Sequence, residues 1–466
     1  MRQVASICLA LPEHMLETVK NDPLIGEIEA IQDGQSVDYW SFKNATRRKG
    51  AHALIHYPAM MVPSLQGKLL DAIKKASPTV SEVLDPFVGS GTILVEAMCR
   101  GFNFTGLDIN PLAALACLAK SGPYYVEAFE QKCFEVCATI RADSGRRHYV
   151  KFENQEKWFD DEISRMISRI ARGIENEQKL WARRLFWLAL AKVVRTSCNS
   201  RMSTYKLHIR KDLTAERANP IDVFENVLDG FLANLQQQYE VWSAADLLQG
   251  GRYRQSVQVK LGDSRALLSE EGLAKKFDVV MTSPPYGDNT TTIPYGQYSY
   301  LPLKWIPLDD IAQDIDPALL SNAYAVDSAS LGGSKRKATE RGSELVNNYQ
   351  SARTFSNTMP VNSSEFKRFA SFFADLDDCA EKIANVTKAG GYQTWTIGNR
   401  RIGGQRVPME EILGEMLERR GVDTVGHIRR TIHAKKMAAR NSVSATMSQE
   451  TILLARKRQQ SAVLSG

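Results

Sequence analysis

The sequence has no apolar run long enough to cross a membrane, for which about 18 consecutive residues are needed. Residues 1–12 are mildly apolar, but they are too short and too weakly charged for a secretory signal peptide. We therefore expect a cytoplasmic protein with no membrane partner.

Cysteines are few and scattered, at positions 8, 99, 117, 133, 137, 198 and 379. Cys133 and Cys137 can share one helix face, but no second pair completes a zinc site, so we expect no metal. Dispersed thiols of this kind are typical of reduced, buried cysteines in a cytosolic protein.

The formal net charge of +6 is modest for 466 residues, of which 43% are hydrophobic and 24% charged. These values indicate an ordinary globular protein with two or three domains, or one large domain with insertions. Basic residues gather in four clusters, at 47–49, 335–341, 400–406 and 429–440. Such clusters suit a polyanionic partner, but they are equally typical of solvated surface.

Seven segments have the alternating apolar pattern and the Gly, Pro, Asn or Asp boundaries of β-strands: 82–87, 104–108, 257–262, 277–282, 391–398, 424–433 and 451–456. The first two alternate with helical runs at 93–100 and 112–120. The last two are expected to form a hairpin around a polar turn at 440–448. This order predicts an α/β protein with a Rossmann-like, seven-stranded mixed sheet that is mostly parallel and has an antiparallel edge.

Two long segments interrupt the strand pattern. Residues 123–250 have helical periodicity, with Phe186, Leu188, Ala189 and Val193 at turn spacing, and predict a helical insertion. Residues 288–360 are rich in Ser, Asn, Gly and Thr, and a connection of this length inside a compact domain is usually functional or mobile.

A glycine-containing turn follows the first strand, in the segment Val-Leu-Asp-Pro-Phe-Val-Gly-Ser-Gly-Thr at 83–92. Glycines let the backbone approach a ligand closely, and the start of the next helix offers free N–H donors to an anion. For a cofactor that carries an amino acid, that anion is the carboxylate, and Asp85 accepts from the ammonium group. The residues expected to bind it here are Asp85, Phe87, Gly89, Ser90, Gly91 and Thr92.

An acidic residue at the end of the second strand, Asp108, is placed where nucleotide-binding sheets hold ribose hydroxyls, with Ile109 beside the adenine face. The alternative is that Asp108 caps the following helix, a role that Asn110 can also fill. Asp263, after the third strand, is a candidate acceptor for the adenine amino group or simply a strand-end acid. The loop lacks the third glycine of a dinucleotide site, which disfavours NAD.

The fourth strand runs into Ser283, Pro284, Pro285 and Tyr286, the most specific feature of the chain. Two prolines remove two N–H donors and leave carbonyl acceptors and a hydroxyl, which suits an exocyclic amino group. Tyr286 offers a ring on which an extruded base can stack. The alternative is a rigid turn after a buried strand. Direct displacement by an amine needs no covalent intermediate, which fits the lack of a cysteine in a Pro-Cys context.

These segments together resemble the amino-methylating DNA methyltransferases, the cytosine-N4 and adenine-N6 group. The segment 52–60, which includes Tyr57 and Pro58, is similar to the one that closes the methionine pocket in that family. Residues 85–92 match its D-P-F-x-G-S-G-T pattern, Asp108 lies in its G-x-D-x-N-P element, and 283–286 match its S-P-P-Y loop. Residues 390–399 and 429–442 are similar to its late strand and its terminal hairpin.

The resemblance implies an S-adenosylmethionine-dependent methyltransferase fold, double-stranded DNA as partner, and a setting in restriction–modification or phage defence with cognate subunits. It divides the chain into an N-terminal segment (1–50), a cofactor-binding half (51–122), a helical insertion with a possible role in target recognition (123–250), a catalytic half (251–290), a mobile loop region (291–360) and the rest of the sheet (361–466). Within the family S-P-P-Y favours cytosine N4, whereas D-P-P-Y or N-P-P-[YF] is the usual adenine-N6 form.

Contacts to DNA are expected from a dense polar segment, 195–208, and from the basic clusters. The candidates are Arg195, Asn199, Arg201, Lys335, Arg336, Arg400, Arg429 and Lys435. A solvated helix end is an equally good interpretation of 195–208, and disordered surface is one for 327–337.

Three rival functions remain open. An RNA guanine-N2 methyltransferase shares the cofactor loop, but it usually reads D-P-P-Y and carries a separate RNA-binding domain, for which the residues before Tyr57 are too few. A protein-glutamine methyltransferase favours N-P-P-Y. A catalytically inactive DNA-binding subunit is disfavoured by the intact Asp85, Asp108 and S-P-P-Y residues.

Overall fold

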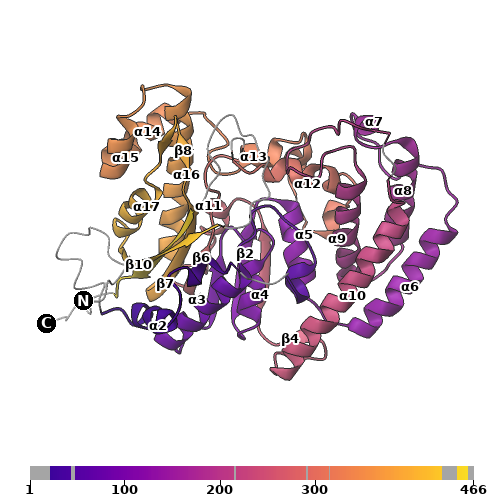
Figure 1. The fold of residues 1–466 in the computed structure, drawn as a ribbon, viewed down its shortest axis with the longest axis horizontal. Coiled ribbons are helices and arrows are strands. Elements are labelled where there is room, and N and C mark those ends of the chain that lie inside the picture. Colours follow the sequence, from indigo (N-terminus) through magenta and orange to yellow (C-terminus); the bar gives the residue numbers. More distant parts are fainter. Residues whose placement is uncertain are drawn as a thin grey trace.

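The computed structural model describes residues 21–43, 48–214, 217–289, 292–313, 315–432 and 449–459. Seven strands form one sheet in the order β10-β11-β7-β6-β1-β2-β5 (Figure 1). They are β1 (Glu82–Asp85), β2 (Asn103–Asp108), β5 (Val257–Leu261), β6 (Phe277–Thr282), β7 (Thr387–Gly398), β10 (Val422–Thr431) and β11 (Gln449–Lys457). Each predicted strand is present, so the α/β fold with a seven-stranded mixed sheet is confirmed. Two small hairpins, β3 (Leu248–Gln249) with β4 (Arg252–Tyr253) and β8 (Arg401–Ile402) with β9 (Gln405–Arg406), were not predicted.

The antiparallel strand of the sheet lies second from the edge rather than at the edge itself. Strands β5, β2, β1, β6 and β7 pair in parallel, and β11 pairs antiparallel with both β7 and β10. Ile452, Leu453 and Leu454 of β11 are buried, whereas β10 carries Arg429 and Arg430. The more apolar strand of the hairpin therefore takes the interior position, and the charged strand forms the edge. The predicted turn of this hairpin, 440–448, lies outside the described residues.

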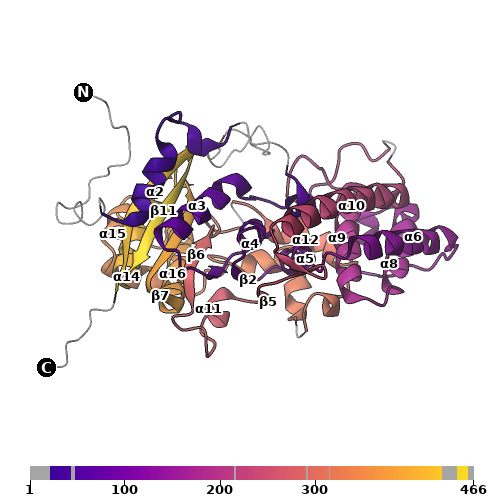
Figure 2. The ribbon, with the colours of Figure 1, turned by 90° about the horizontal axis from the view of Figure 1, so that it is seen from below.

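Helices cover both faces of the sheet, because successive strand residues point to opposite sides. Val83 and Val279 face one apolar core, which also holds α2 (Pro23–Gln32), α3 (Pro63–Ala76), α4 (Thr92–Met98) and α5 (Pro111–Lys120). Leu84 and Val280 face a second core with α16 (Ser364–Val386) and α17 (Met409–Glu418). The result is a three-layer α/β/α arrangement (Figure 2).

The described part of the predicted N-terminal segment belongs to the first core. Leu24, Ile25 and Ile28 of α2 are buried, and Ile25 lies against Gly426 of β10. Asp22, which caps α2, forms an ion pair with Arg456 of β11 at 3.0 Å. The segment thus packs against β10 and β11 at one edge of the sheet.

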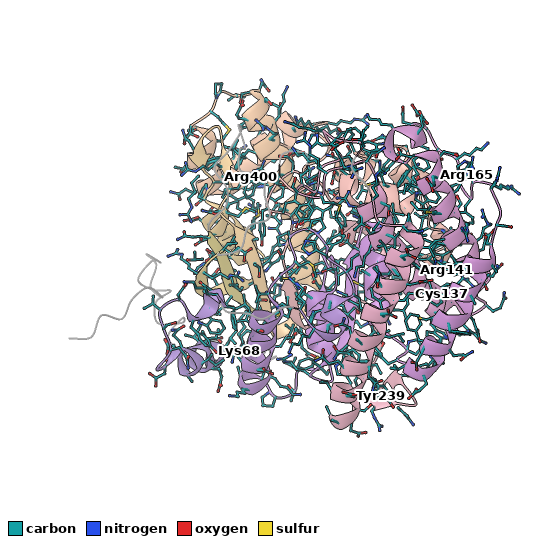
Figure 3. All side chains as sticks on the ribbon, turned by 45° about the vertical axis from the view of Figure 1, so that its right-hand side comes forward. Lys68, Cys137, Arg141, Arg165, Tyr239 and Arg400 are labelled. Atoms are coloured by element: carbon teal, nitrogen blue, oxygen red, sulfur yellow. The ribbon has the colours of Figure 1, made fainter. Side chains whose placement is uncertain are left out.

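Five helices fill the predicted insertion: α6 (Val126–Ala142), α7 (Gln155–Trp158), α8 (Asp161–Glu175), α9 (Leu180–Ser197) and α10 (Pro220–Ala244). They form the right-hand side of the molecule in Figure 1, and Arg141 and Arg165 lie on its outer helices in Figure 3. The apolar positions predicted for α9 are all fully buried, and they share one continuous core with α5. The insertion therefore extends the layer on one face of the sheet.

The segment predicted as a mobile loop, 291–360, is largely helical where it is described. It contains α12 (Tyr295–Leu303), α13 (Ala325–Ala329), α14 (Ala338–Asn348) and α15 (Gln350–Ser356). Each short helix buries only a few apolar side chains, such as Leu345 and Phe355. The helical periodicity was therefore weak, and the polar composition led to the prediction of a loop. A four-residue helix after β5, α11 (Ser264–Leu267), and four 3-10 turns complete the fold: η1 (Tyr39–Ser41), η2 (Gly50–Ala53), η3 (Leu308–Asp310) and η4 (Pro317–Leu320).

None of the helices in the described ranges combines the length and the apolar character needed to span a membrane. The six cysteines in these ranges are free thiols. No group of His, Cys, Asp and Glu side chains in the same part of the chain is arranged to hold a metal ion.

Candidate active site

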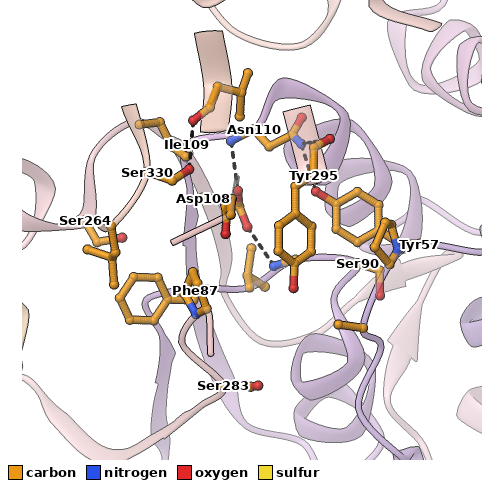
Figure 4. Close-up of a pocket in the computed structure, with 18 of the residues that line it drawn as sticks. Tyr57, Phe87, Ser90, Asp108, Ile109, Asn110, Ser264, Ser283, Tyr295 and Ser330 are labelled. Atoms are coloured by element: carbon orange, nitrogen blue, oxygen red, sulfur yellow. Dashed lines mark hydrogen bonds between the residues drawn. The ribbon is translucent and has the colours of Figure 1, made fainter. Parts of the chain in front are cut away.

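A cavity opens where β1, β2, β5 and β6 end (Figure 4). The carboxyl ends of adjacent parallel strands are where open α/β sheets bind ligands. Its wall contains many of the residues predicted from the sequence: Tyr57, Pro58, Phe87, Gly89, Ser90, Thr92, Asp108, Ile109, Asp263, Ser283 and Pro285. The structure thus brings the two main sequence signals, 83–92 and 283–286, to one cavity.

The glycine turn after β1 has the conformation that its sequence predicts. Gly89 and Gly91 have φ angles of 50° and 76°, in the left-handed region that favours glycine. A Cβ atom on Gly91 would lie 3.0 Å from Cys117 Sγ, so a side chain there would also have to displace the thiol. Gly91 is the residue before α4. Gly89 and Ser90 line the cavity, whereas Gly91 does not.

Two side chains of α5 hold this turn from behind. Lys120 Nζ donates to the Ser90 carbonyl at 2.6 Å, and Cys117 Sγ donates to the Gly89 carbonyl at 3.4 Å. Lys120 is fully buried, and burial lowers its pKa to about 8. Sequence reasoning missed Lys120, because a lysine in the last turn of a helix ordinarily indicates a solvated cation at the negative end of the helix dipole.

Asp85 is fully buried at the end of β1 and is not part of the cavity wall. Its Oδ1 accepts from Thr282 Oγ1 at 2.8 Å and from the Phe87 amide at 3.1 Å, whereas Oδ2 has no hydrogen-bond partner. Burial raises the pKa of Asp85 to about 7, against the effect of the two hydrogen bonds. An unpaired buried carboxylate oxygen is costly, so this position is suited to a donor that arrives with a ligand.

Asp108 lies in the cavity wall at the end of β2, as predicted. Its Oδ2 accepts from the Gly89 amide and its Oδ1 from the Asn110 amide, each at 2.8 Å. Burial raises the pKa of Asp108 to about 6, while these hydrogen bonds lower it. Asn110 is the residue that caps α5, through a 3.0 Å bond from the Leu112 amide, so the alternative role of Asp108 as the helix cap is wrong.

An aromatic pair closes another side of the cavity. The rings of Tyr57 and Tyr295 stack with centroids 5.8 Å apart, and the Tyr57 hydroxyl accepts from Asn110 Nδ2 at 2.9 Å. Burial raises the pKa of Tyr57 well above its ordinary value, so the phenol stays protonated. Tyr295 and the nearby wall residues Val326, Ala329, Ser330 and Leu331 come from the segment that was predicted as a mobile loop. The polar composition of this segment did not indicate that it lines the cavity.

Asp263 reaches the cavity wall, but a neighbour already engages its carboxylate. It caps α11 through the Arg265 amide, and its Oδ2 lies 2.6 Å from Arg265 Nη2. Burial alone would raise the pKa of Asp263, but the bonds from Arg265 lower it. Arg265 also pairs with Asp375 at 2.7 Å, which fixes the guanidinium between two acids. The contact to adenine that the sequence suggested therefore remains a prediction.

The S-P-P-Y residues divide into two groups. Ser283 and Pro285 line the cavity, whereas Pro284 is buried and Tyr286 lies off the wall. The Tyr286 hydroxyl donates to Glu450 Oε1 of β11 at 3.0 Å, and Ser283 Oγ donates to the Tyr286 hydroxyl at 3.4 Å. The sequence predicted that the Tyr286 ring faces the cavity, whereas Tyr286 is not among the residues that line it. The bond to Glu450 could not be predicted from the sequence.

Three of the residues predicted to contact DNA are buried inside the protein. Asn199 accepts from Arg217 and donates to the Lys157 carbonyl at 3.1 Å. Arg400 lies in the interior, where Nη2 is 2.6 Å from Asp288 Oδ2 (Figure 3). Arg195 is only 5% exposed, and its guanidinium packs over the ring of Tyr298. These three predictions are wrong, because the side chains are buried inside the protein and are not accessible to a duplex.

The other candidates for DNA contacts remain accessible where they are described. Arg201, Lys335 and Arg336 are exposed. Arg429 is partly exposed and donates to Glu410 Oε2 at 3.0 Å. Lys435, Arg47 and most of the cluster at 429–440 lie outside the described residues.

Comparison with known proteins gives one relative of nearly full length. The Type II methyltransferase M.MvaI of Kocuria varians is 28% identical over 433 residues, which cover 89% of this chain and 93% of the relative. The Type II methyltransferase M.MjaII of Methanocaldococcus jannaschii is 27% identical over 132 residues, which are 26% of this chain and only 24% of that protein. No family model matches the chain.

Among solved structures, an SAM-dependent methyltransferase of Methanosarcina mazei aligns over 82% of this chain and 94% of its own. The TM-score is 0.27 and the identity 8%, values too low to establish a common fold. The similarity that carries weight is therefore the one in sequence, to the methyltransferase of Kocuria varians.

Proposed function

We propose that the protein is a site-specific DNA methyltransferase that transfers a methyl group from S-adenosylmethionine to the exocyclic N4 amine of cytosine. The alternative target is the N6 amine of adenine. The observation that carries the proposal is that Ser283 and Pro285, from a segment rich in acceptors, line the same cavity as the glycine turn of β1. Similarity to a Type II methyltransferase over 89% of the chain supports methyl transfer, without distinguishing between the two amines.

The residues around the cavity fit the cofactor. Asp85 Oδ2, buried and without a partner, suits the ammonium group, and the amides at the start of α4 suit the carboxylate. Asp108 and Ile109 suit the ribose and the adenine face, and Tyr57 suits the methionine end. When bound, the cofactor supplies an electrophilic methyl group carried on a sulfonium.

The protein's own contribution to the reaction is to orient the amine. Ser283 Oγ and the Pro284 carbonyl are acceptors, and the two prolines provide no N–H group to compete with them. Hydrogen bonds from the amine to these acceptors free its lone pair from conjugation with the base ring. Catalysis then rests on positioning and on fixed dipoles.

The DNA enters as a duplex whose target base is turned out into the cavity. Arg201, Lys335 and Arg336 are exposed cations that suit phosphate contacts, which fix the register on the duplex. A role in restriction–modification or phage defence, with a cognate nuclease, belongs to the same proposal.

The test is to incubate the protein with tritium-labelled S-adenosylmethionine and unmodified plasmid DNA, and to digest the DNA to nucleosides. The expected product is N4-methyldeoxycytidine. Label in N6-methyldeoxyadenosine would overturn the assignment to cytosine, and label in RNA but not in DNA would overturn the substrate class. Ser283→Ala is the matched variant, which is expected to bind the cofactor normally and to transfer the methyl group poorly.

A further inference from the structure

A chain of three side chains connects the cavity to the far hairpin of the sheet. Ser283 Oγ lies 3.4 Å from the Tyr286 hydroxyl, which lies 3.0 Å from Glu450 Oε1. The other carboxylate oxygen of Glu450 lies 3.5 Å from Nε of the buried Arg430. Of the three members of the chain, only Ser283 lines the cavity.

The chemistry of Glu450 sets the direction of this chain. A carboxylate only accepts hydrogen bonds, and that of Glu450 lies beside the guanidinium of Arg430. Tyr286 must therefore donate its single proton to Glu450, and its oxygen is left to accept from Ser283. Burial raises the pKa of Tyr286 well above its ordinary value, and the charge of Glu450 acts in the same direction, so the phenol keeps that proton.

Ser283 therefore donates its only hydroxyl proton to Tyr286. Only the lone pairs of its oxygen then face the cavity, so the hydroxyl acts there as an acceptor. A free serine hydroxyl can turn and donate, and a donor would repel the N–H groups of an amine. The Ser283–Tyr286 contact is long for two hydroxyls, as catalytic hydrogen bonds often are before substrate closes the site.

We propose that Glu450 is a positioning residue that, through Tyr286, holds Ser283 as a pure acceptor for the target amine. This inference rests on the proposed function, and it holds for cytosine N4 and adenine N6 alike. It also gives the Tyr286 hydroxyl a role besides that of the ring.

The chain also accounts for the proton that the reaction releases. The amine nitrogen uses its lone pair to bond the methyl carbon, as the carbon–sulfur bond breaks and leaves its electron pair on sulfur. The cationic nitrogen then gives one proton to Ser283 Oγ. At the same time the Ser283 proton passes to Tyr286 and the Tyr286 proton passes to Glu450, so both hydroxyls end neutral.

The test compares Tyr286→Phe, Glu450→Gln and the double variant in single-turnover methylation of plasmid DNA. Phenylalanine keeps the aromatic ring but removes the hydroxyl that links Ser283 to Glu450, and glutamine keeps the shape but cannot take up the proton. Each single variant is expected to lose about 10- to 100-fold in rate, the range for a hydrogen bond to a charged group. The double variant is expected to be no slower than Tyr286→Phe, because Glu450 acts only through Tyr286.

Equilibrium dialysis with labelled S-adenosylmethionine and thermal unfolding provide readouts besides activity. The cofactor Kd and the unfolding midpoint are expected to stay near the wild-type values in Tyr286→Phe. Glu410→Gln is the matched control, since Glu410 is also bonded by an arginine of β10 and by Thr451 of β11, but forms no hydrogen bond or ion pair with residues 283–286 in the described part of the chain. It is expected to keep the wild-type rate.

A wild-type rate in Tyr286→Phe or Glu450→Gln, or additive losses in the double variant, would overturn the role of Glu450. A wild-type protein that transfers no methyl group to DNA would instead overturn the proposed function. The two failures are therefore distinguishable.

Discussion

At the scale of one residue, Asp85 is a buried carboxyl that lowers the stability of the ligand-free protein. The sequence predicted Asp85 as a cofactor ligand from its place before the glycine turn. The structure adds that the carboxyl is fully buried, that its Oδ2 has no partner and that burial raises its pKa to about 7. Because the folded pKa lies above the unfolded value near 3.8, the folded state binds more protons between these two pH values. Asp85 therefore lowers stability as the pH rises through this window.

Asp85→Asn is expected to make the ligand-free protein more stable than the wild type at pH 8, by on the order of 1–4 kcal/mol. The difference is expected to disappear below pH 4, where the wild-type carboxyl is protonated in both states. The same variant is expected to lose cofactor affinity, because the ammonium group loses its counter-charge. Urea unfolding at several pH values and equilibrium dialysis measure the two effects.

The partly exposed acid Asp423, paired with Arg458, provides the control. Asp423→Asn is expected to leave cofactor affinity unchanged. If Asp85→Asn were less stable than the wild type at pH 8 and kept its cofactor affinity, the assignment of Asp85 would be wrong.

Lys120 is the residue of the site that the sequence did not reveal. Burial lowers its pKa from 10.5 to about 8, so the unfolded state binds more protons between these values and stability rises with pH across that window. Lys120→Met is expected to remove this rise. It is also expected to weaken cofactor binding about 10-fold, which is the effect of losing a charge-assisted hydrogen bond, because the Ser90 carbonyl loses its donor.

Lys74→Met is the matched control for this variant. Lys74 also donates to a backbone carbonyl, that of Arg100, at 3.2 Å, but it does so at the surface. Unchanged cofactor affinity in Lys120→Met would show that the glycine turn holds its shape without this contact.

At the scale of elements, the sequence predicted well wherever periodicity was strong. All seven strands of the sheet and the buried face of α9 followed from apolar spacing and from glycine or proline boundaries. Helices α12 to α15 did not, because each is short and its few buried residues lie among Ser, Asn and Thr. The part of the cavity wall that Tyr295 and Leu331 form comes from this segment, so it carried no readable signal in the sequence.

The irregular segment after α9 contains both buried and exposed polar residues, although the sequence predicted DNA contacts from both kinds. Arg201→Ala is expected to weaken DNA binding and to lower the slope of log affinity against log salt by about 1, because one phosphate contact is lost. Filter binding of duplex DNA at several salt concentrations measures this slope. The protein's stability is expected to stay the same.

Asn199→Ala is the comparison on the same segment. Asn199 is 2% exposed and bonds Arg217 and the Lys157 carbonyl, so its loss is expected to cost about 1–3 kcal/mol of folding free energy. Its effect on the salt slope is expected to be nil. An unchanged salt slope in Arg201→Ala would remove this arginine from the DNA surface.

At the scale of the whole molecule, one apolar core joins the helical insertion to the sheet, and a second core lies on the other face. The mostly parallel direction of the strands could be anticipated from the alternation of strands and helices, whereas the strand order, with β11 inside the edge, was not predicted. Which loops converge on the cavity could not be anticipated, because residues as distant as 57, 295 and 331 meet only once the sheet is assembled. The basic clusters suited a polyanionic partner, but the sequence did not show which of their cations are exposed.

The most direct test of the central claim is to express the protein in a host that lacks DNA methyltransferases and to sequence its methylome. The proposal predicts one short recognition sequence, methylated at cytosine N4 throughout the genome and unmodified in cells that express Ser283→Ala. Genomic DNA without any methylated amine, in cells that contain folded wild-type protein, would contradict it.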